Sequence, residues 1–140
     1  MTANNTILAV AEKLTDLWPD RKVRVDEIPK DADGVFFVQV LTPSQNRELG
    51  DRHRRASTIS VIYFTKDHEN MVYNDWAETM MLHFVDIAIG GTLYQTKRPH
   101  AEQVGREYHF LFDLDIGVMI KDPSAENMEG MAYEGSLKDG

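Results

Sequence analysis

Two periods of apolar residues run along the chain, and each period predicts a different kind of element. Over residues 6–18 the apolar positions recur at helical spacing, at Ile7, Leu8, Ala11, Leu14 and Trp18. Asn5 or Thr6 is the expected N-cap of this helix, and Pro19 is expected to end it.

A second helix is predicted over residues 74–91. Asp75 and Glu78 form a loose capping box at its start, and the pair Gly90-Gly91 is expected to terminate it. Its apolar stripe consists of Trp76, Met80, Phe84 and Ile87.

The strand period begins after the first helix. Residues 23–28 predict a short edge strand, and residues 35–42 predict a strong apolar strand that Pro43 stops. A polar, turn-rich stretch then leads into the alternating residues 56–64, so we expect two long strands joined by a long loop.

Residues 92–99 and 106–118 predict a further strand pair that turns around residues 99–105. In the second of these strands Tyr108, Phe110, Phe112, Leu114, Ile116 and Val118 all point one way. We expect a core held by Phe36, Val38, Val40, Phe110, Phe112 and Leu114 and covered by the apolar stripe of the second helix.

These elements predict an α/β protein of the α+β type, a mostly antiparallel β-sheet with two main helices packed on it and an extended β-hairpin loop. A chain of 140 residues suits a single domain, which we place at residues 1–120. Residues 121–140 are acidic and glycine-rich, and we expect them to form a loose tail.

Charge and composition narrow the functional classes. The formal net charge is −8, which argues against a general affinity for nucleic acid. There is no cysteine, so disulfides, thiolate metal sites and cysteine nucleophiles are excluded. The N-terminal residues lack the pattern of a signal peptide, and no apolar run approaches the roughly 20 residues of a membrane span, so we expect a soluble cytoplasmic protein without membrane contact.

Catalytic and cofactor signatures are weak. The five histidines show no spacing typical of metal ligands, and no nucleophile elbow or phosphate-binding loop occurs, so we expect no catalytic residue, metal or cofactor. His109, Asp113 and Asp115 fall on one side of a predicted strand, where a histidine beside acids could serve acid–base chemistry. A solvated strand face explains the same pattern and is the favoured interpretation.

The strongest local feature is a basic cluster. Residues 47–55 hold four arginines against two acids, a net charge of +2, which leaves −10 on the rest of the chain. Such a patch either keeps a strand end solvated or pairs with carboxylates of another protein. We predict a subunit or partner interface, and alternation along the strand places its residues on two faces. The predicted interface residues are Arg47, Arg52, His53, Arg54 and Arg55.

The order of these motifs resembles the tail terminator, or tail completion, proteins of long-tailed bacteriophages and prophage elements. The resemblance covers residues 5–118. It rests on the apolar strand that ends in Pro43, the basic step at residues 52–55, the alternating strand at residues 57–65, and the "YHFLF" strand at residues 108–112. Thr65 stands where the family's proline follows "YF".

The resemblance implies a structural protein that assembles as a homo-oligomeric ring, a hexamer, at the head-proximal end of the tail tube. The ring stops tube polymerisation and provides the head-joining surface. Its partners are further copies of itself, the tail tube protein and head–tail connector proteins, and DNA passes through the lumen without specific binding. The protein is assembled in the host cytoplasm into the virion tail. The alternatives are another connector or neck protein, or a small cytoplasmic enzyme that uses His109, Asp113 and Asp115.

Overall fold

The computed structural model describes residues 2–30, 32–67 and 69–120. These residues divide into two units. The first unit lies within residues 1–44 and 56–115, and the second consists of residues 45–55 and 116–120. The predicted tail at residues 121–140 lies outside the described residues.

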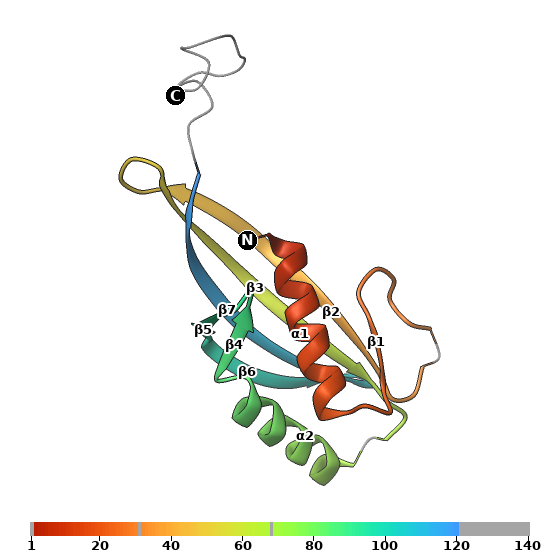
Figure 1. The fold of residues 1–140 in the computed structure, drawn as a ribbon. Coiled ribbons are helices and arrows are strands. Elements are labelled where there is room, and N and C mark those ends of the chain that lie inside the picture. The colour runs from red at the N-terminus through yellow and green to blue at the C-terminus, as the bar shows by residue number, and fades with distance from the viewer. Residues whose placement is uncertain (1, 31, 68, 121–140) are drawn as a thin grey trace. The chain divides into compact units, whose positions relative to one another are not determined.

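The described part of the chain contains two helices, a five-stranded sheet and a two-stranded sheet (Figure 1). The larger sheet has the order β1-β2-β3-β7-β6, in which β1 runs parallel to β2 and β6 antiparallel to β7. This arrangement confirms the α+β prediction. The elements are α1 Ala3–Leu17, β1 Lys22–Arg24, β2 Val35–Arg47, β3 Arg52–Phe64, α2 Asn70–His83, β4 Asp86–Ile89, β5 Thr92–Gln95, β6 Lys97–Val104 and β7 Glu107–Met119.

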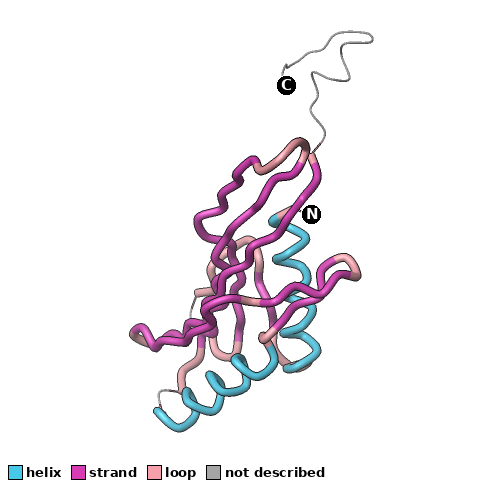
Figure 2. The backbone as a smooth tube through the Cα atoms, turned by 90° about the vertical axis from the view of Figure 1, so that its left-hand side faces the viewer, coloured by secondary structure: helices cyan, strands magenta, loops and turns pink. Residues whose placement is uncertain are grey.

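Both helices belong to the first unit. α1 contacts β1 and β4, and α2 contacts β6. Figure 2 shows α1 alongside the strands of this unit and α2 at one end of them. No helix in residues 2–30, 32–67 and 69–120 is long and apolar enough to cross a membrane.

α1 begins earlier than predicted. Its N-cap is Thr2, whose side chain accepts a hydrogen bond from the Asn5 backbone N–H, while the Asn5 side chain accepts one from the Thr2 N–H. This reciprocal capping satisfies two helix donors, so the predicted caps at Asn5 and Thr6 are wrong. The predicted stripe is wrong in part as well, because Leu8 is 60% exposed while Val10 is buried beside the predicted Leu14.

β2 continues through Pro43 to Arg47, so the prediction that Pro43 stops the strand is wrong. β1 pairs with β2 at residues 35–37, so β2 is an edge strand beyond that point, and an edge tolerates a residue without an N–H. The predicted long loop is wrong too. β2 and β3 are joined by residues 48–51, where Gly50 has a φ of +65°.

α2 begins at Asn70 after the N-cap Glu69, so the predicted capping box of Asp75 and Glu78 is wrong. The helix ends at His83 rather than at Gly90-Gly91. Thr96 explains the earlier end, because its hydroxyl donates to the carbonyl oxygens of Phe84 and Val85 at 2.6 and 2.9 Å. Gly90 and Gly91, with φ of +60° and +84°, instead form the tight turn of the β4–β5 hairpin.

The predicted turn at residues 99–105 is also wrong in extent. Most of it belongs to β6, an edge strand with an irregular register between Lys97 and His100. Pro99 lies in this irregularity, where no ladder N–H is needed. The chain turns at Gly105, whose φ is +58°.

The predicted alternation of β7 is confirmed, since Tyr108, Phe110, Phe112 and Leu114 are buried. The predicted cover is confirmed as well: Trp76, Met80, Phe84 and Ile87 are buried, although Phe84 and Ile87 lie beyond α2. The Phe84 ring lies 5.9 Å, centroid to centroid, from both Phe110 and Phe112. Phe36 and Val38 are fully buried as predicted, whereas Val40 is only half-buried.

Phe112→Ala should lower the free energy of unfolding by about 3–5 kcal/mol, because it removes a fully buried ring and leaves a cavity between β7 and Phe84. Urea unfolding followed by circular dichroism measures the loss. Leu93→Ala is the control, since Leu93 is 65% exposed and its variant should stay within about 0.5 kcal/mol of wild type. Equal stability of the two variants would contradict the assigned core.

Candidate functional site

The five predicted interface residues lie in one segment of the second unit. Arg47 ends β2, and Arg52, His53, Arg54 and Arg55 begin β3. The loop between them is closed by two backbone hydrogen bonds, from the Glu48 N–H to the Arg52 carbonyl and from the Arg52 N–H to the Leu49 carbonyl. We call residues 45–55 the basic hairpin.

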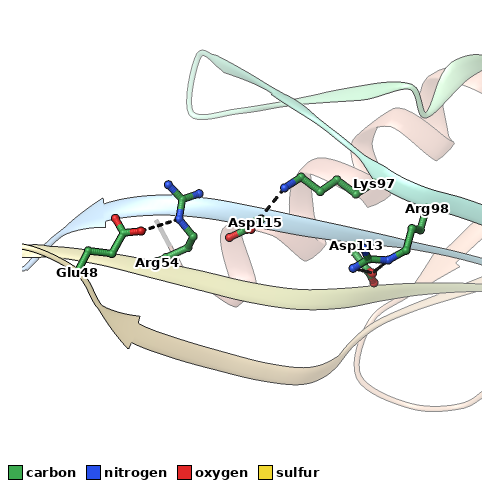
Figure 3. A network of polar contacts seen from close by, with 6 residues as sticks. All are labelled: Glu48, Arg54, Lys97, Arg98, Asp113 and Asp115. Atoms are coloured by element: carbon green, nitrogen blue, oxygen red, sulfur yellow. Dashed lines mark hydrogen bonds and ion pairs between the residues drawn. The ribbon is translucent and has the colours of Figure 1, made fainter.

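Two arginines of the basic hairpin have partners within it. The Arg54 Nε donates to the Glu48 Oε2 at 3.0 Å (Figure 3), and the Arg55 Nε donates to the Gln45 Oε1 at 2.8 Å. The first contact joins β3 to the connecting loop, and the second joins β3 to β2. They hold both guanidinium groups close to the hairpin and stabilise its shape.

The other three residues differ in exposure. Arg47 and Arg52 are exposed, and the side chain of neither makes a hydrogen bond or ion pair with any of the described residues. His53 is buried, and its Nδ1 lies 3.1 Å from the Asp51 carbonyl oxygen. The predicted alternation therefore holds for Arg52, His53 and Arg54, and the exposed positive charge of the hairpin is carried by its arginines.

A second group of charges lies in the first unit on β6 and β7. Asp113 accepts a hydrogen bond from the Thr58 hydroxyl at 2.7 Å. It accepts another from the Arg98 Nε at 2.7 Å, which Figure 3 shows. Arg98 has a φ of +52°, an uncommon conformation for a residue with a side chain, and it lies in the irregular part of β6. Lys97 pairs with Asp115 at 3.4 Å.

The electrostatics of Asp113 suit an ion pair rather than an acid catalyst. Burial opposes its ionisation, but the hydrogen bonds from Thr58 and Arg98, together with the guanidinium charge, outweigh burial and hold the pKa of Asp113 below its ordinary value. His109 has its own contact, with its Nε2 2.9 Å from the Glu107 Oε1. The three residues of the enzyme alternative thus engage different neighbours.

An open cleft of about 980 Å³ lies in the first unit. Aromatic side chains line it, among them Tyr63, Trp76 and Tyr108, and the Tyr108 hydroxyl donates to the Asp67 carbonyl at 2.8 Å. The cleft also contains five acidic and two basic side chains: Asp20, Asp33, Asp67, Glu69, Asp75, Arg21 and Lys66. We call this the acidic cleft.

The acidic cleft was not foreseen from the sequence. Its acids come from the end of α1, from the segment before β2 and from the start of α2, so no local motif unites them. The excess of acids at residues 67–78 was the one signal available, and it is common on solvated helices.

The model of the family described as phage tail terminator protein matches residues 6–126. The chain belongs to this family. This confirms the resemblance drawn from the sequence and extends it beyond residue 118.

As a member of this family, the protein is a structural component of a phage tail, since the family is structural rather than enzymatic. No curated protein matches the chain. A solved structure shares 15% sequence identity with the chain at a TM-score of 0.43, and the match covers 82% of this chain and 94% of the other.

Asp113→Asn should lower the free energy of unfolding at pH 7 by about 1–2 kcal/mol, because it removes a charge-assisted hydrogen bond from a half-buried position. The folded-state pKa of Asp113 is lowered, so its stabilisation is present above the unfolded pKa of about 4 and is lost as the pH falls through the folded pKa. Urea unfolding at pH 7 and pH 3 should show a smaller difference at pH 3.

The matched control is Asp16→Asn, at an exposed position of α1. Its stability should stay within about 0.5 kcal/mol of wild type at both pH values. A deficit in Asp113→Asn that grows on acidification would contradict the ion pair with Arg98.

Proposed function

We propose that this protein forms a hexameric ring that caps the tail tube at its head-proximal end. The ring stops tube polymerisation and presents the surface to which the filled head is joined. The observation that carries the proposal is the family match across residues 6–126. The tube protein, the head–tail connector proteins and further copies of the chain are the partners, and assembly takes place in the host cytoplasm.

The basic hairpin supports an assembly role. Its charge of +2 stands on a chain whose other residues carry −10, so its field is local. Salt screens exposed charges within about 8–10 Å, which is too short a range to hold DNA against the net charge of the chain but sufficient for carboxylates on a neighbouring protein. We therefore assign Arg47, Arg52, His53, Arg54 and Arg55 to a protein contact, in which buried His53 supports the exposed arginines.

The acidity of the chain suits the passage of DNA through such a ring. A duplex binds a protein chiefly through cations that displace its counterions. A chain with a net charge of −8 repels the phosphates, so DNA slides through the lumen without specific binding.

We further propose that residues 1–120 form the folding domain and that residues 121–140 act by contacting a neighbour. A chain ending at Ile120 keeps the hydrogen bond from the Ile120 N–H to the Asp51 carbonyl. Its melting temperature should lie within about 2 °C of that of the full chain, since it retains every side chain that is buried among the described residues. Differential scanning calorimetry measures this, and a truncated chain that fails to fold would place residues 121–140 in the core.

Changing Arg52, Arg54 and Arg55 together to glutamate should abolish ring formation and tube capping in a subunit that remains folded. The change reverses the charge of the basic hairpin, which then repels an acidic partner surface. Sedimentation velocity measures ring formation, and electron microscopy of tubes incubated with the protein measures capping.

The control replaces the exposed cations Lys22, Arg24 and Arg106 by glutamate, which changes the net charge equally and should leave assembly intact. Binding to duplex DNA is measured for both variants at low and physiological salt. Intact assembly together with lost DNA affinity in the hairpin variant would invert the assignment.

A further inference from the structure

We propose that the acidic cleft of one subunit receives the basic hairpin of the next subunit in the ring. This inference rests on the proposed ring and names the two surfaces that close it. The hairpin and the cleft are different surfaces of one chain. A contact between them is therefore head-to-tail, the kind that generates a closed ring when it is repeated.

The charges of the two surfaces are complementary. The acidic cleft has five acidic and two basic side chains, a net charge of −3, and the basic hairpin has +2. Glu69 and Asp75 are exposed, and their side chains make no hydrogen bond or ion pair with the described residues. On the hairpin, Arg47 and Arg52 are exposed, and their side chains likewise make no hydrogen bond or ion pair with the described residues. Each surface thus has exposed charged side chains that can pair with another subunit.

The apolar parts of the two surfaces also correspond. Leu49 lies at the tip of the hairpin and is 81% exposed, whereas the acidic cleft is lined by the rings of Trp18, Tyr63 and Trp76. Burial of a leucine side chain against aromatic rings removes apolar surface from water and so stabilises a contact. Glu69 and Asp75 lie beside these rings in the cleft. The cleft therefore favours an apolar tip that is flanked by arginines, such as Leu49 with Arg47 and Arg52, over a segment that carries charges alone.

The cleft already holds one guanidinium group in the manner required. The Arg21 guanidinium lies over the Tyr63 ring, 5.3 Å from its centroid, and contacts the Tyr63 hydroxyl. Planar guanidinium groups stack on aromatic faces while donating to carboxylates. Asp33 stays charged beside them, because the Lys66 backbone N–H donates to it at 3.0 Å and its pKa lies below the ordinary value.

Charge exchange between the two surfaces tests the contact. The hairpin variant carries Arg47→Glu with Arg52→Glu, and the cleft variant carries Glu69→Lys with Asp75→Lys. Each alone should remain folded and sediment as a subunit rather than a ring. A chain with all four changes should form rings again, because every reversed hairpin meets a reversed cleft. An equimolar mixture of the two single-surface variants should form mixed rings in which contacts between two reversed surfaces alternate with contacts between two unchanged surfaces.

Two matched controls change the same net charge elsewhere. They are Arg24→Glu with Arg106→Glu, and Asp16→Lys with Glu78→Lys, at exposed positions outside both surfaces. Both should form rings. Leu49→Ala, which leaves every charge in place, should weaken ring formation at least tenfold in concentration.

The outcomes separate this contact from the ring itself. Rings from all variants would overturn the contact and leave the ring proposal standing. The contact would also be overturned if the chain with all four changes and the mixture stay folded but form no rings. It would be overturned as well if the cleft binds a basic segment of the tube protein in place of the hairpin. A wild-type chain that caps no tube and forms no ring would overturn the proposed function as well.

Discussion

The buried face of β7 packs against side chains of α2 and of the residues just after it. This contact positions the other elements. Tyr108, Phe110 and Phe112 alternate along the strand, and Phe84 lies against two of them. Because the apolar residues occupy one face, the opposite face of β7 carries Asp113 and Asp115, which bind Arg98 and Lys97 of β6. One alternating strand thus fixes both the core and the pairing of its edge neighbour.

Elements whose pattern is set by burial were predictable from the sequence. The alternation of β7 and the stripe of Trp76 and Met80 are examples, because each reflects one dry face. The boundaries were not predictable where a distant residue decides them. Thr96 ends α2 through hydrogen bonds to the carbonyl groups of Phe84 and Val85, just past the last helical residue, and Pro43 is tolerated because β1 leaves that part of β2 unpaired.

The same distinction applies to the candidate site. The basic hairpin is contiguous in sequence, so its arginines were found, although the burial of His53 and the pairing of Arg54 with Glu48 required the structure. The acidic cleft joins segments far apart in the chain and required the fold. The proposed self-assembly has a physical basis, since each copy carries a basic hairpin and an acidic cleft, two surfaces of opposite charge.

The length distribution of phage tails tests the central claim most directly. Electron microscopy would compare tails assembled with the gene for this chain intact and with the gene removed. The account predicts that removal leaves the tube protein able to polymerise past its normal end, which gives a broad distribution of long tubes without joined heads. Tails of unchanged, uniform length that carry heads would contradict a terminator role for this protein.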